Sequence, residues 1–128
     1  MLQSILVISL GASMGAVFRW LLGLALNSVY PPIPLGTLVA NLLGGYLIGL
    51  AVGCFASFPS IPTEWGLLIV IGFLGSLTTF SSFSLETVVL IREGRQLMAC
   101  GLVALHVCGS LAATFLGLAS FSLIRRIL

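Results

Sequence analysis

The sequence predicts an all-α integral membrane protein with four membrane-spanning helices. Of its 128 residues, 59% are hydrophobic and only 6% are charged, and the mean hydropathy is +1.26. A soluble domain of this length carries more charge than that. The apolar residues form four runs, each long enough to cross a hydrocarbon core of about 30 Å. We therefore expect a single transmembrane domain, residues 1–128, with spans at approximately 2–26, 35–55, 65–91 and 97–123.

The same composition argues against several classes of function. The net charge of +2 is too small to indicate nucleic-acid binding. The three cysteines lie in apolar runs without a CxxC pair, which favours packing over a metal site or a disulfide framework. The sequence has no nucleophile–base pair and no phosphate-binding loop. We therefore do not expect an enzyme.

The first span combines a stripe of small residues with one arginine. The stripe lets helices approach closely in lipid, and it consists of Gly11, Ala12, Gly15 and Ala16. Arg19 lies near the end of the span. Its side chain either reaches the headgroups as an interfacial anchor or faces the protein interior at the mouth of a pathway.

The second span places Asn41 about one turn inside its start. The amide of Asn41 has two N–H donors, so it could solvate an anion or form a hydrogen bond to another helix. A second close-packing face follows along the same span. It comprises Gly44, Gly45, Gly49 and Gly53.

The third span is the most unusual, because residues 72–86 (GFLGSLTTFSSFSLE) bring many polar groups and two glycines to membrane depth. Unpaired polar groups in hydrocarbon cost several kcal/mol, so this segment must be buried in protein or line a wet path. We expect the helix to break around residues 75–79. A broken helix offers free carbonyls to a cation and free N–H groups to an anion.

Two stripes follow the expected break. Phe80 and Phe83 share one helix face, and Ser81 and Ser84 form an adjacent stripe of hydroxyls. Two phenylalanines at this spacing usually pack, but their ring edges carry partial positive charge and can face an anion. Glu86 comes next, either as a solvated or arginine-paired carboxylate near the helix end or as a deeper functional group.

The fourth span carries polar residues at intervals of four, and so on one face: His106, Ser110 and Thr114. A single histidine is more often a hydrogen-bonded bundle residue than a ligand. A polar stripe opposite a polar break nevertheless makes a pore wall credible.

The distribution of the arginines does not indicate on which side of the membrane the termini lie. Arg125 and Arg126 lie on the side of the termini, whereas Arg92 and Arg95, with Arg19 if it reaches the surface, lie on the other side. Cytoplasmic segments normally carry the excess of positive charge. A near balance predicts insertion in both orientations, and four short helices enclose a pathway poorly. We therefore expect an antiparallel, dual-topology homodimer.

Four stretches of the chain resemble the Fluc/CrcB family of fluoride channels. They touch all four spans, and the third is highly specific: residues 15–20 (GAVFRW), 34–49 (PLGTLVANLLGGYLIG), 72–86 and 109–117 (GSLAATFLG). The resemblance implies an antiparallel, dual-topology homodimer that passively exports fluoride from the cytoplasm through two pores. It also implies a multi-pass protein of a bacterial inner membrane. Its partners would be fluoride, membrane lipid and a second copy of the chain, and nucleic acid would not be among them.

The resemblance also implies roles for individual residues. The pore residues would be Phe80, Phe83, Asn41, Ser81, Ser84, Ser110, Thr114, His106, Thr37 and Glu86. Arg19 matches a functionally important arginine. A structural sodium ion at the dimer axis would be held by main-chain carbonyls of Gly75 and Thr78. Two positions depart from the usual family pattern: Ser76 replaces a second glycine, which bears on the bend of the break, and Ser82 replaces a threonine.

Two other functions fit four short spans. A small proton-coupled multidrug transporter needs a carboxylate deep in the first span, and this span has no acidic residue. A non-conducting assembly subunit would use the polar segment only to join helices, and would pass no ions.

Overall fold

The structure, a computed structural model, describes residues 1–127, and within them every regular element is helical. The first two spans are α1 (Leu2–Leu26) and α2 (Leu35–Ser57), and the fourth is α6 (Gln96–Ile127). The third span, Thr63–Arg92, contains several helical pieces. All four are long and apolar enough to cross a membrane. The prediction of an all-helical protein with four spans is therefore confirmed.

The third span changes its helical geometry along its length. A short helix α3 (Thr63–Gly66) leads into a π-helix η1 (Leu67–Leu74) and then into the single turn α4 (Gly75–Leu77). The helical path stops there, because the next two residues have extended backbones: Thr78 has φ −78° and ψ 153°, and Thr79 has φ −149° and ψ 123°. Helix α5 (Phe80–Arg92) then completes the span.

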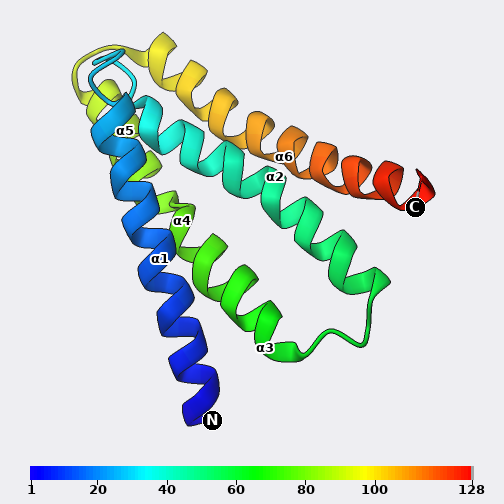
Figure 1. Ribbon diagram of the computed structural model, residues 1–128. Helices are drawn as coiled ribbons and strands as arrows, with labels where there is room; N and C mark the ends of the chain where they lie inside the picture. Colours follow the sequence, from blue (N-terminus) through cyan, green and yellow to red (C-terminus); the bar gives the residue numbers. More distant parts are fainter. Residues whose placement is uncertain (128) are drawn as a thin grey trace.

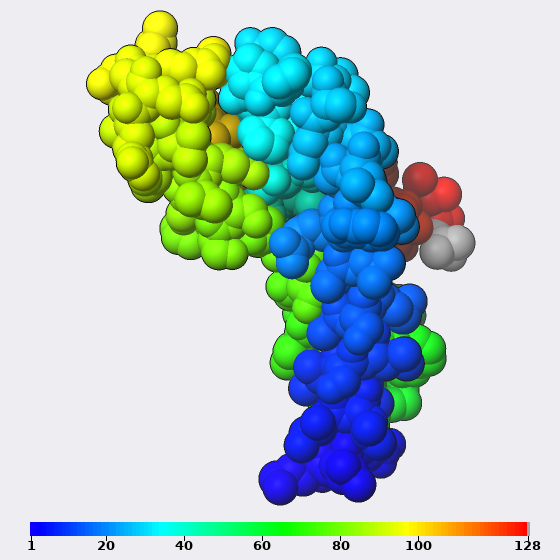
Figure 2. Space-filling model, turned by 90° about the vertical axis from the view of Figure 1, so that its left-hand side faces the viewer, coloured from blue at the N-terminus to red at the C-terminus, as the bar shows by residue number. Residues whose placement is uncertain are grey.

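The helices pair two by two and diverge from a common end. Helix α2 packs along α6, and α1 packs along η1 and α4. Figure 1 shows these pairs as two arms, which meet where α5 and the start of α6 lie and separate toward α3 and the chain termini. The space-filling view shows the same elongated outline, with the α5 end standing out beside α1 (Figure 2). Such an open shape leaves little of the chain enclosed.

Glycines allow the close approach within each arm. A Cβ atom on Gly72 of η1 would lie 3.0 Å from Gly11 Cα, and one on Gly117 of α6 would lie 3.1 Å from Gly49 Cα. Backbones that approach this closely gain packing contacts that lipid does not provide. The small-residue stripes of the first two spans are thus helix contacts.

The buried core is small and divided in two. One cluster joins α2 to η1 and α4 through Ala40, Leu74 and Leu77, and the other joins α5 to α6 around Phe83 and Leu102. Most other large apolar side chains are exposed, including Phe80 and Leu111. In a membrane protein, such side chains face lipid or another subunit.

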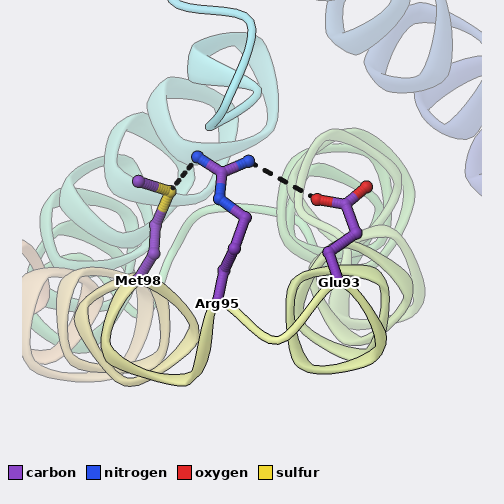
Figure 3. Close-up of polar contacts among 3 residues, drawn as sticks. All are labelled: Glu93, Arg95 and Met98. Atoms are coloured by element: carbon purple, nitrogen blue, oxygen red, sulfur yellow. Dashed lines mark hydrogen bonds and ion pairs between the residues drawn. The ribbon is translucent and has the colours of Figure 1, made fainter.

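A tight turn connects α5 to α6. Gly94 has φ +76°, a left-handed conformation that glycine adopts without steric cost. The N–H of Arg95 donates to the Leu90 carbonyl at 2.9 Å. The Arg95 guanidinium lies between two side chains (Figure 3): Nη1 is 3.4 Å from Glu93 Oε2, and Nη2 is 2.9 Å from Met98 Sδ. The ion pair is exposed and adds little stability.

Candidate functional site

The centre of the site is the two-residue interruption between α4 and α5. Backbone groups that lose their helical partners need new ones at membrane depth. The Asn41 amide supplies two of them: Asn41 Nδ2 donates to the Thr79 carbonyl at 3.0 Å, and the Thr79 N–H donates to Asn41 Oδ1 at 2.7 Å. The Thr79 hydroxyl then caps α5 by accepting from the Ser82 N–H at 3.2 Å. Of the two roles that the sequence left open for Asn41, the structure has the hydrogen bond between helices.

Arg19 reaches the same segment from α1. Its Nε donates to the Ser76 carbonyl at 3.1 Å, and the side chain is half-buried. The guanidinium therefore links α1 to the backbone of the third span. The Thr78 hydroxyl donates to the Leu74 carbonyl at 2.9 Å, so polar side chains support both sides of the interruption.

Three aromatic rings contact one another beside the interruption. Phe80 is 78% exposed, whereas Phe83 is only 8% exposed. Their ring centroids are 5.5 Å apart at an interplanar angle of 68°, an edge-to-face arrangement. Phe83 also stacks on the His106 ring, with centroids 4.7 Å apart and an angle of 28°. The phenylalanine pair and the histidine thus form one aromatic group built from α5 and α6.

His106 lies in the buried interior, where its side chain is 4% exposed. Its Nδ1 is 2.9 Å from Asn41 Nδ2, which continues the hydrogen-bond network from the third span to the fourth. Its Nε2 is buried and has no hydrogen-bond partner among the described residues.

A cavity of about 500 Å³ collects these groups. It lies between α2, the third span and α6. Seven of the predicted site residues line it: Asn41, Gly75, Thr78, Phe80, Phe83, His106 and Ser110. No charged side chain is among the residues that line it. The cavity is therefore lined by aromatic rings, an amide, an imidazole and hydroxyls, without a charged side chain.

Four predicted hydroxyl residues do not line this cavity, and three of them bond locally. Ser84 Oγ donates to the Phe80 carbonyl at 2.8 Å, and Thr114 Oγ1 donates to the Ser110 carbonyl at 3.0 Å. Ser81 Oγ lies 3.2 Å from Thr79 Oγ1. Serine and threonine commonly bond back to their own helix in this way.

Thr37 and Glu86 form a second polar contact, nearer the common end of the helices. Thr37 Oγ1 donates to Glu86 Oε1 at 2.6 Å, and Glu86 Oε2 is buried without a partner in residues 1–127. Thr37 also lines a second cavity, of about 390 Å³, with Arg19, Asn27 and Ser82. Of the predicted site residues, only Arg19 and Thr37 line this second cavity, and Ser81, Ser84, Thr114 and Glu86 line neither of the two.

Two residues of this network did not stand out in the sequence. Thr79 precedes a helix and has Ser82 three positions later, which is the spacing of an N-cap and its partner. Asn27 ends α1, and its Oδ1 accepts from the Gly36 N–H at 2.8 Å at the start of α2. Both carry the ordinary signature of a cap, which by itself gives no indication of a functional site.

Comparison with known proteins gives a consistent result. The family described as CrcB-like protein, Camphor Resistance (CrcB), matches residues 6–118. The chain is 61% identical to a protein of Tolumonas auensis named fluoride-specific ion channel FluC, over 98% of this chain and 99% of the relative. It is 60% identical to a protein of the same name from Pseudomonas syringae pv. maculicola, over 97% and 98%. A third, from Chromobacterium violaceum, is 53% identical over 98% and 100%. Since the match covers most of the chain and the relatives align over nearly their full lengths, the chain belongs to the CrcB family.

Proposed function

We propose that the chain forms a passive, fluoride-specific ion channel that exports cytoplasmic fluoride across the bacterial inner membrane. The observation that carries this proposal is the cavity beside Thr78 and Thr79, where polar and aromatic side chains from three spans meet without a charged side chain. The relatives named fluoride-specific ion channels share most of their sequence with this chain, which supports fluoride as the ion.

The composition of the cavity suits a small anion. Moving such an ion from water into a medium of low dielectric has an idealised cost on the order of 20 kcal/mol, so new ligands must replace water at nearly every step. The edges of Phe80 and Phe83 carry partial positive charge, and Ser110 adds a hydroxyl. A strong fixed charge would trap the ion, whereas conduction needs sites that the ion can leave.

The pathway that we propose joins the two cavities. It runs from Ser110 and Thr114 past the aromatic group, Ser81 and Ser84, and continues to the contact between Thr37 and Glu86. Arg19 stands at the second cavity and provides positive charge at the mouth of the pathway. When the serine and threonine hydroxyls rotate toward the ion, they would give up their local hydrogen bonds and donate to the anion instead.

The channel would be an antiparallel, dual-topology homodimer with two pores. Phe80 and Gly75 line the first cavity but are exposed in the single chain, so one wall of the cavity is incomplete. A second copy related by a two-fold axis in the membrane plane would complete it. The near balance of arginines on the two sides of the membrane is consistent with insertion in both orientations.

We also infer that the interruption at Thr78 and Thr79 is a break within the membrane that binds a structural sodium ion. In a continuous helix the Thr79 N–H would donate to the Gly75 carbonyl. Here it donates to Asn41 Oδ1 instead. Likewise, the Ser82 N–H would donate to the Thr78 carbonyl in a continuous helix, whereas here it donates to the Thr79 hydroxyl. Both carbonyls are therefore open to a hard cation, which prefers oxygen ligands. The ion would be shared with the partner subunit and would hold the two breaks together.

Fluoride efflux from liposomes that contain only the purified protein tests the proposed function. The variants Phe80→Ile and Phe83→Ile keep apolar bulk but remove the ring edges, so we expect each to lose most of the efflux. Phe115→Ile is the matched control, because Phe115 is an exposed ring outside both cavities. Unchanged efflux in the first two variants would refute the role of the ring edges.

A further inference from the structure

The Thr79 peptide group determines which way the Asn41 amide faces. Its N–H donates to Oδ1 at 2.7 Å, and its carbonyl accepts from Nδ2 at 3.0 Å. A flipped amide would bring two donors together at the first contact and two acceptors together at the second. The choice between oxygen and nitrogen therefore follows from the backbone of the interruption.

This orientation determines the state of His106. The atom that faces His106 Nδ1, at 2.9 Å, is Asn41 Nδ2, which can only donate. Nδ1 must therefore accept and cannot carry a proton. The ring is then neutral, and its proton lies on Nε2, because a doubly protonated ring would place two donors against each other.

The surroundings of the ring agree with a neutral histidine. Its described contacts are the amide of Asn41 from α2 and the ring of Phe83 from α5. Glu86 is bonded to Thr37, and Arg19 is bonded to the Ser76 carbonyl, so neither charged group contacts the imidazole.

We propose that the Thr79 peptide, acting through Asn41, holds His106 as the neutral tautomer with its proton on Nε2. Asn41 is then a positioning residue for His106. Its role in transport, which rests on the proposed function, is to keep positive charge out of the cavity wall. Nε2 is the ring nitrogen whose hydrogen-bonding capacity residues 1–127 leave unused.

Nuclear magnetic resonance tests the tautomer directly. The chain has a single histidine, so protein labelled with ¹⁵N-histidine, and purified without a histidine tag, gives one imidazole signal set. We expect Nε2 to show a one-bond coupling to hydrogen, and Nδ1 to resonate far downfield as an unprotonated nitrogen. A proton on Nδ1 of the wild-type protein would overturn the proposal.

Asn41→Asp separates positioning from packing. The carboxylate keeps the size of the side chain but can only accept, so Nδ1 should gain a proton and its resonance should move upfield. Ser110→Ala, which alters the same cavity without a described contact to the ring, should leave the tautomer unchanged. An unprotonated Nδ1 in Asn41→Asp would contradict the role of Asn41. Should this variant fail to fold, the wild-type spectrum still decides the tautomer.

Fluoride efflux measured on the same samples distinguishes failure of the proposed channel from failure of the proposed His106 tautomer. We expect Asn41→Asp to lose most of its efflux, and the spectrum reports the tautomer whether or not the protein conducts. A wild-type protein with the expected spectrum but no fluoride efflux would refute the channel alone. A conducting protein with a proton on Nδ1 would refute the tautomer alone.

Discussion

Thr79 satisfies three hydrogen-bonding needs of the interrupted third span. Its N–H and carbonyl pair with Asn41, and its hydroxyl caps α5. Without these partners, polar backbone groups would lie unpaired at membrane depth, which is energetically costly. At the scale of single residues, the site is therefore a set of side chains that make an irregular backbone tolerable.

Removal of the cap should destabilise the protein. Thr79→Ala deletes the acceptor for the Ser82 N–H, and loss of an N-cap costs about 1 kcal/mol. Thr79→Ser keeps the hydroxyl and should stay close to the wild-type free energy of unfolding. Denaturant titration in detergent measures the difference, and equal midpoints for Ala and Ser would contradict the capping role.

The contact between Thr37 and Glu86 gives a second prediction at this scale. Thr37→Val has nearly the same shape but removes the donor to Glu86 Oε1, which leaves both carboxylate oxygens without a described partner. An unsatisfied buried polar group costs about 1–3 kcal/mol. We expect lower stability and slower fluoride efflux in Thr37→Val, with Thr37→Ser near wild type. If Val and Ser behave alike in both assays, the hydrogen bond has no role.

The sequence predicted some of the residues that line the first cavity, but not how they bond. Helical spacing placed His106 and Ser110 on one face, and both line the cavity. Spacing could not show that Asn41 pairs with a peptide group, because that contact depends on where the backbone is extended. Nor could it show that the Ser84 and Thr114 hydroxyls bond to their own helices, since a rotation about one bond decides their direction.

Glycines determine how the helices pair. Gly117 of α6 faces Gly49 of α2, and Gly72 of η1 faces Gly11 of α1. The stripes of small residues made these contacts predictable, because small residues mark helix contacts in lipid.

The π-helix was not predictable, since Leu67–Leu74 is almost entirely apolar and carries no pattern that distinguishes one helical period from another. Helix α6 also continues beyond the expected residue 123, because no glycine or proline follows Gly117 to end it.

A matched pair of alanine substitutions on α6 tests the glycine contacts. A Cβ atom on Gly117 would lie 3.0 Å from the Leu50 nitrogen, whereas one on Gly101 would meet nothing within 4 Å. Overpacking of a close contact costs about 1–3 kcal/mol. Gly117→Ala should therefore lower the free energy of unfolding, and Gly101→Ala should leave it unchanged or raise it slightly. The same effect at both positions would mean that the contact between α2 and α6 is not tight.

The whole molecule is open on the side of the first cavity. Two pairs of helices diverge from a common end, and many large apolar side chains remain exposed (Figure 1). Composition predicted the four spans but not this shape, because lipid-facing and subunit-facing side chains are equally apolar. An antiparallel partner would complete the open wall.

Added lysines test the requirement for both orientations. Lysines after Arg126 should fix the termini in the cytoplasm, and lysines in the loop between α1 and α2 should fix them outside. Each variant alone should be inactive in cells, while co-expression of the two should restore fluoride export. Glutamines at the same positions control for the insertion itself. Full activity from one variant alone would contradict dual topology.

The most direct test of the central claim is the release of fluoride and chloride from liposomes that contain only this protein. Ion-selective electrodes record both ions, with empty liposomes as the reference. A selective fluoride channel should release fluoride rapidly while chloride stays near the level of the reference. Chloride loss as fast as fluoride loss, or no fluoride loss from liposomes in which the dimer is intact, would contradict a selective fluoride channel.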